Sequence, residues 1–278
     1  PTLAPPKLFQ MLANPDLSLW VKSVLLFIYP LFKIRSIHKL RICHQKSYEV
    51  SDITVLLSKR YIPEYVEMMK VDKKKLVVKN NPIKGKFEIS ESEIKAKEKL
   101  LLMVTRLDEN QKCVIKALKI WQKVTKTNSD WKFIIVGNGP DEKKIKAFAV
   151  NNKIAGVEFV SACDPIDYYK RSSIFLMTSR NEGWPNTINE AMRMGCVPVV
   201  ITSFSAVYDM IENEKEGFLV PNDDNVICTC SKFLNILIND FGIRMFMAHK
   251  AIEKTKRLSL DIISDEWIKM FNNLIENK

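Results

Sequence analysis

The sequence predicts an α/β fold, in which a doubly wound parallel sheet of six strands follows a partial second α/β domain. From Leu100 onward, short apolar runs alternate with amphipathic segments of helical length. The runs are continuous, as in LLMV and FIIV, which is typical of strands that are buried on both faces. Strands that alternate with helices join in parallel through right-handed crossovers, so we expect helices on both faces of the sheet.

Six apolar runs are the predicted strands. They are residues 100–104, 133–136, 157–160, 174–177, 197–201 and 218–220. Five helical patterns separate these runs. They lie at about residues 114–125, 141–151, 166–172, 187–194 and 206–212. The tail, residues 225–278, is predicted to form three more helices.

The chain is predicted to have three parts. Residues 1–83 hold two strand patterns, at 51–57 and 75–83, and residues 84–99 are charged and nearly free of large apolar side chains. Two strands in under 90 residues do not make an independent core. We therefore expect 1–83 to be the remnant of an N-terminal domain whose front is absent, 84–99 to be a linker, and 100–278 to be the main domain with its C-terminal helices.

The net charge of +11 limits the partners of this chain. A solvated basic surface and attraction to an anionic membrane explain it equally well, and nucleic acid is a weaker third explanation because no stacking-platform or zinc-finger pattern occurs. Residues 17–41 mix aromatic and aliphatic residues with Lys and Arg, so this segment is either a helix on a membrane surface or a helix buried in its own domain. Pro30 is expected to break or kink it.

The six cysteines and three histidines do not form a metal-binding pattern. Cys228 and Cys230 make a C-x-C without a second pair, and most cysteines lie in or beside apolar runs. This usage suits a reducing compartment. We expect a cytoplasmic protein, at the inner face of the membrane if the basic segment binds lipid.

Two carboxylates follow the strand at 174–177. Glu182 lies in the loop after this strand, and Glu190 lies eight residues later, about one turn into the next helix. Open α/β sheets bind ligands at the carboxyl ends of their strands, and a helix N-terminus there attracts phosphate. Carboxylates accept hydrogen bonds from sugar hydroxyls. The combination indicates a nucleotide-sugar site, and a glycosidase pair fits less well because both groups lie on one side.

Two basic residues follow the first strand of the main sheet, in VTRLDENQK. The guanidinium of Arg106 and the ammonium of Lys112 suit a diphosphate that gains charge as it leaves. They are also two of 43 basic residues, so exposed surface side chains are an alternative. Gly137 and Gly139 make a turn after the second strand, but Glu142 excludes the G-x-G-x-x-G fingerprint.

Four segments in order give the chain a family resemblance: VTRLDENQK, IIVGNGP, DPIDYYKRSSIFLMTS and EGWPNTINEAMRMGCVPVV with its E-x7-E spacing. Together they resemble the donor-binding domain of the retaining group 1 glycosyltransferases, whose fold is the two-domain GT-B type with Rossmann-like sheets. KNNPI resembles the hinge before that domain, which implies that residues 1–83 are the remnant of the N-terminal acceptor-binding domain. Thr105 and Cys113 stand where the family often has glycine.

The resemblance implies a role for each matching residue. It places the donor diphosphate on Arg106 and Lys112, the ribose hydroxyls on Glu190 and the transferred sugar on Glu182. Arg106, Lys112 and Glu182 would serve catalysis. It also implies that the backbone at Gly183, Trp184, Pro185 and Asn186 lines the sugar and the phosphate. The base would lie near Gly137, Gly139 and Ser161.

The resemblance also implies the reaction. We expect a hexosyltransferase that moves a sugar from a nucleoside diphosphate, uridine rather than guanosine, to a glycan or lipid-linked acceptor in surface polysaccharide assembly. Such enzymes retain the anomeric configuration by front-face displacement and need no metal or other cofactor. Two alternatives stay open: a nucleotide-binding protein without transferase activity, and a nucleotide-sugar epimerase of the same architecture.

Overall fold

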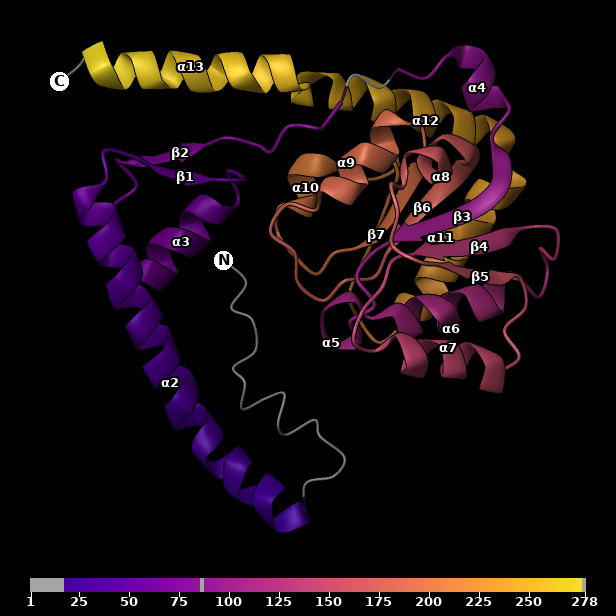
Figure 1. Ribbon diagram of the computed structural model, residues 1–278, viewed down its shortest axis with the longest axis horizontal. Coiled ribbons are helices and arrows are strands. Elements are labelled where there is room, and N and C mark those ends of the chain that lie inside the picture. Colours follow the sequence, from indigo (N-terminus) through magenta and orange to yellow (C-terminus); the bar gives the residue numbers. More distant parts are fainter. Residues whose placement is uncertain (1–17, 86–87, 277–278) are drawn as a thin grey trace. The chain divides into compact units, whose positions relative to one another are not determined.

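The structure is a computed structural model that describes residues 18–85 and 88–276. The chain forms two compact units, Pro1–Lys79 and Asn80–Lys278 (Figure 1). Each unit is described by itself below.

The second unit is built on one sheet of six parallel strands, in the order β5-β4-β3-β6-β7-β8. The strands are β3 (Glu98–Val104), β4 (Lys132–Val136), β5 (Val157–Val160), β6 (Ser172–Met177), β7 (Val197–Ile201) and β8 (Phe218–Val220). All six predicted strands are confirmed, and so is the doubly wound parallel arrangement. The order reverses between β3 and β6, which lie side by side at the centre of the sheet.

Helices follow the strands in turn. They are α5 (Glu109–Lys112), α6 (Val114–Val124), α7 (Glu142–Asn151), α8 (Ile166–Arg171), α9 (Asn186–Arg193) and α10 (Val207–Met210). The tail forms α11 (Val226–Asn239), α12 (Phe241–Thr255), the 3₁₀ turn η1 (Lys256–Leu258) and α13 (Leu260–Glu276), which confirms the three predicted helices.

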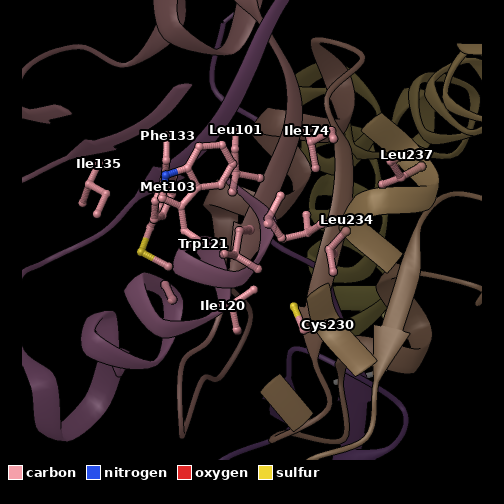
Figure 2. Close-up of a cluster of buried hydrophobic side chains, with 14 of the residues drawn as sticks. Leu101, Met103, Ile120, Trp121, Phe133, Ile135, Ile174, Cys230, Leu234 and Leu237 are labelled. Atoms are coloured by element: carbon pink, nitrogen blue, oxygen red, sulfur yellow. The ribbon is translucent and has the colours of Figure 1, made fainter. Parts of the chain in front are cut away.

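Alternate residues of the central strands supply the main core. In β3, Leu101 and Met103 face the same side as the fully buried Trp121 of α6 (Figure 2). Leu234 and Leu237 of α11 extend this cluster along the sheet. Because side chains of a strand alternate between the two faces, the intervening residues Leu100 and Leu102 face the other side and are buried as well. Burial on both faces is what the continuous apolar runs predict.

The segment predicted as a linker, 84–99, differs from that expectation. It contains α4 (Glu91–Lys95), which starts with a capping box in which Ser90 accepts from the Glu93 amide and the Glu93 carboxylate accepts from the Ser90 amide. Ile94 of α4 is buried in the main core, and β3 already begins at Glu98. The segment is charged because most of its side chains face solvent, while two apolar residues, the buried Ile94 and the partly buried Ile89, pack it against the main core.

The first unit holds α2 (Leu19–Val50), β1 (Thr54–Leu56), α3 (Tyr61–Met69) and β2 (Leu76–Val78). The two strands pair in parallel, and Tyr65, Met69 and Leu76 form a small core. α2 runs through Pro30 without ending there, so the expected break is absent. In the described part of the chain no single helix has the length and apolarity to cross a bilayer; α11 with the segment 241–258 meets that test only as a pair bent by 101°.

Candidate functional site

The site lies where the strand order reverses. The loops after β3 and β6 leave the carboxyl ends of two neighbouring strands whose connections run to opposite sides. This topological switch point leaves a crevice between the loops, which is where open α/β sheets bind ligands. The two loops are joined, because the Arg180 amide donates to the Gln111 carbonyl over 2.7 Å.

A cleft of about 490 Å³ opens at this point. Its walls come from the ends of β3, β4 and β6, from the loops that follow them, from the loop after β5 and from the start of α9. The polar lining residues are Thr105, Arg106, Lys112, Asn138, Cys163, Glu182, Asn186 and Thr187. The cleft is therefore the place where most of the chemically active side chains predicted from the sequence meet.

Lys112 and Glu182 form an ion pair in the wall of the cleft. The Lys112 Nζ lies 2.6 Å from the Glu182 Oε1, and the two side chains are only 18% and 10% exposed. They are 70 residues apart in the chain, on the loops of two different strands. A pair that is this well shielded is electrostatically stronger than a surface pair. It keeps a cation and a carboxylate together at one point of the cleft.

The local structure fixes Lys112 at the end of α5. Asp108 caps this helix, accepting from the Asn110 and Gln111 amides. Cys113 follows with a φ of 51°, in the left-handed region that favours glycine over a residue with a side chain. The Thr178 hydroxyl at the end of β6 lies 3.0 Å from the carbonyls of Lys112 and Cys113, to which it donates.

Arg106 also lines the cleft and is more accessible than Lys112. Its side chain is 60% exposed, and its guanidinium pairs with Asp108, which is 16% exposed and also caps α5. The guanidinium is therefore open to solvent at the cleft.

The two glycines after β4 are required by close contacts of the backbone. Gly137 has a φ of +144°, and a Cβ there would lie 1.8 Å from the Thr105 carbonyl oxygen. At Gly139 the same atom would lie 2.3 Å from the Leu107 carbonyl oxygen. The loop thus lies directly against the loop after β3, to which it is also joined by a hydrogen bond from the Leu107 amide to the Asn138 carbonyl. Gly137 reaches the cleft, whereas Gly139 acts in the packing of the two loops.

Asn138, between these glycines, links the site to the loop after β5. Its Oδ1 accepts a hydrogen bond of 2.8 Å from the Ala162 amide. Ala162 and the exposed Cys163 continue the wall beside it. No pattern in the sequence indicates Ala162 or Cys163 as part of a site. Asn138 could have been found from its place inside the Gly-x-Gly turn.

Glu190 is half-buried on α9, and Tyr169 of α8 donates to its Oε2 over 3.0 Å. Burial raises the pKa of Glu190, while the Tyr169 hydrogen bond and the charge of Lys84 oppose that rise. Close by, the Asn81 side chain donates to the Asn186 Oδ1 over 3.3 Å, which brings the KNNPI segment to the start of α9.

The structure places the residues predicted for the site in two groups. Six line the cleft, and five lie around it. The first group is Arg106, Lys112, Gly137, Glu182, Pro185 and Asn186; the second is Gly139, Ser161, Gly183, Trp184 and Glu190. Trp184 as a whole is only 5% exposed, so its indole and most of its backbone are buried.

Comparison with known proteins identifies the family. Residues 98–239 match the family description "Glycosyl transferases group 1". An uncharacterized glycosyltransferase of Haemophilus influenzae is 32% identical over 152 residues, which are 54% of this chain and 42% of that protein. A Campylobacter jejuni protein is 27% identical over 195 residues, which are 68% of this chain and 52% of that protein. Its name is that of an α-1,4-N-acetyl-D-galactosaminyltransferase for a glycan on undecaprenol diphosphate. The chain thus spans about half the length of these relatives.

Solved structures show the same fold. Staphylococcus aureus TarM, solved with UDP, has a TM-score of 0.71 and 20% identity over 80% of this chain and 44% of its own. The predicted GT-B type of sheet is confirmed by this likeness. Because the residues that match this family make up half of the chain, the chain belongs to the group 1 glycosyl transferases.

Proposed function

We propose that the cleft holds the donor of a hexosyltransferase, a nucleoside diphosphate sugar with uridine as its nucleoside, and that the sugar passes with retention to a glycan or lipid-linked acceptor. The observation that carries this proposal is the shielded Lys112–Glu182 pair, which shares a cleft with Arg106 at the switch point of the sheet. The names of relatives support the assignment to polysaccharide assembly, such as the Staphylococcus aureus capsular polysaccharide glycosyltransferase CapM, 26% identical over 151 residues.

The diphosphate would lie between Arg106 and Lys112, with the amides at the start of α9 facing it. Lys112 would then exchange part of its contact with Glu182 for the phosphate oxygens. The freed Glu182 oxygen would accept from a hydroxyl of the transferred sugar beside Gly183. Glu190 would hold the ribose hydroxyls, and the base would lie near Gly137 and Ser161.

The chemistry follows from the charges in the cleft. When the bond to the sugar breaks, negative charge develops on the leaving diphosphate, and two fixed cations stabilise this charge without reorganising. Retention by front-face displacement places the acceptor on the same face as the leaving group, so the diphosphate oxygen itself takes the acceptor's proton. Because Arg106 and Lys112 supply the positive charge, we propose that the reaction needs no metal.

The expected result of the direct test is saturable binding of UDP, tighter than that of GDP and unchanged by a chelator. Calorimetric titration with each nucleotide, in excess chelator and in excess magnesium, measures it. UDP should also protect Cys163 from a maleimide, while Cys43 and Cys228, which are exposed elsewhere, react at an unchanged rate and serve as internal controls. Binding that appears only with magnesium would refute the metal independence, and an unprotected Cys163 would refute the placement of the base.

We further propose peripheral contact of the first unit with an anionic membrane. Residues 1–79 carry 14 Lys and Arg against 6 Asp and Glu, so +8 of the total +11 lies there. On α2 the side chains of Trp20, Phe27, Leu31 and Ile34 are 64% to 84% exposed, at spacings that place them on one stripe. Such a stripe, flanked by cations, suits the interface of an anionic bilayer.

Flotation with lipid vesicles tests this membrane contact. The protein is expected to float with vesicles that contain anionic lipid and not with neutral ones. The double variant Trp20→Ser/Phe27→Ser should lose this binding, while Val150→Ser, an equally exposed apolar position in the second unit, should keep it. Equal flotation of both variants would count against α2 as the contact.

A further inference from the structure

Tyr169 is a buried tyrosine whose hydroxyl meets the site. Its side chain is 1% exposed, and its ring lies 6.2 Å from that of Phe175. The hydroxyl donates over 3.0 Å to the Oε2 of Glu190, which lies on a different helix. A phenylalanine would fill the same space, so packing alone does not explain the hydroxyl group.

The backbone around Tyr169 is held by the mostly buried ammonium group of Lys97. The Nζ of Lys97 donates to the carbonyls of Tyr169, Lys170 and Ser172 at 2.8, 2.9 and 2.7 Å. The Cys196 thiol donates to the Tyr169 carbonyl as well, over 3.0 Å. A cation at the C-terminus of a helix is favourable, and these contacts fix the end of α8 from several directions. The hydroxyl is therefore held at a defined point rather than carried on a mobile helix.

We propose that Tyr169 is a positioning residue of the donor site, which holds the Glu190 carboxylate ionised and in one orientation so that its free oxygen accepts from the ribose hydroxyls. This inference rests on the proposed function, because Glu190 is the group through which Tyr169 acts. It assigns a role to a residue that contacts neither the sugar nor the phosphates.

The charges around Glu190 determine how the loss of the Tyr169 hydroxyl should change the pH dependence of UDP binding. Burial raises the pKa of Glu190, and the nearby Asp164 raises it further. The Tyr169 hydroxyl and the Lys84 ammonium lower it. In this proposal the ionised Glu190 carboxylate binds the ribose. The affinity for UDP therefore has its full value above the pKa of Glu190 and falls as the pH drops through that pKa. Removal of the hydroxyl raises the pKa, and the loss of affinity then begins at higher pH.

The test is the pH dependence of UDP binding by Tyr169→Phe. We expect the variant to bind more weakly than the wild type at low pH, by up to about tenfold for a pKa shift of about one unit, and within about twofold of it near pH 8. Because both affinities are measured at the same pH, the titration of UDP itself cancels in the ratio of the variant's affinity to that of the wild type. Tyr168→Phe, on the same helix, is the matched control and should follow the wild type at both values.

A double-mutant cycle with Glu190→Gln separates positioning from a structural effect. Tyr169→Phe should change UDP affinity less than twofold in the Glu190→Gln background, at every pH. A weakening that does not vary with pH, or that persists in the Glu190→Gln protein, would overturn the inference. If the wild type does not bind UDP, or Glu190→Gln binds it as well as the wild type, the proposed function fails instead.

Discussion

Replacement of Lys112 by alanine is expected to weaken UDP binding on the order of 100-fold, because a charge-assisted contact to phosphate is worth about 3 kcal/mol. The same change should lower the free energy of unfolding by about 2–3 kcal/mol, because it removes the ion-pair partner of the well-shielded Glu182 carboxylate. Calorimetric titration measures the first effect, and chemical denaturation measures the second.

The double variant Lys112→Met/Glu182→Gln separates the two effects. It removes both charges while it keeps the volume of both side chains, so most of the lost stability should return. UDP binding should not return, because the cation is still absent. Recovery of binding in the double variant would show that Lys112 acts only as a partner of Glu182, and the proposed diphosphate site would then be wrong.

The sheet was predictable because strands that are buried on both faces need continuous apolar runs. LLMV and FIIV have no other stable placement in a domain of this size, and β3 and β4 contain them. The grouping of Arg106 and Glu182 was predictable for a related reason. Both lie in a loop that follows a strand, and parallel strands bring their carboxyl ends to one edge.

Contacts between residues that are distant in sequence could not be predicted in this way. Nothing local pairs Lys112 with Glu182, or Tyr169 with Glu190; both contacts depend on strand order and on the angles of the short helices α5 and α8. The docking of the charged segment 84–99 was missed because one buried residue, Ile94, outweighs a polar composition.

Replacement of Gly137 by alanine is expected to cost about 3 kcal/mol of unfolding free energy, near the upper limit for an overpacked site. The reason is the close contact of two loops. A Cβ at Gly137 would overlap the Thr105 carbonyl oxygen, which is backbone and cannot turn away as a side chain would. The φ of +144° adds strain for any L-residue other than glycine.

The matched control is the same substitution at Gly183, in the loop after β6. A Cβ at Gly183 would meet no atom within 4 Å, and this glycine has no left-handed φ. Gly183→Ala should therefore unfold within about 0.5 kcal/mol of the wild type, as surface substitutions usually do. If the transferred sugar occupies this open space, Gly183→Ala should weaken binding of UDP-sugar but not of UDP. Chemical denaturation of both variants decides the structural claim: equal stability of Gly137→Ala and Gly183→Ala would mean that the loops after β3 and β4 do not lie as close together as the structure shows.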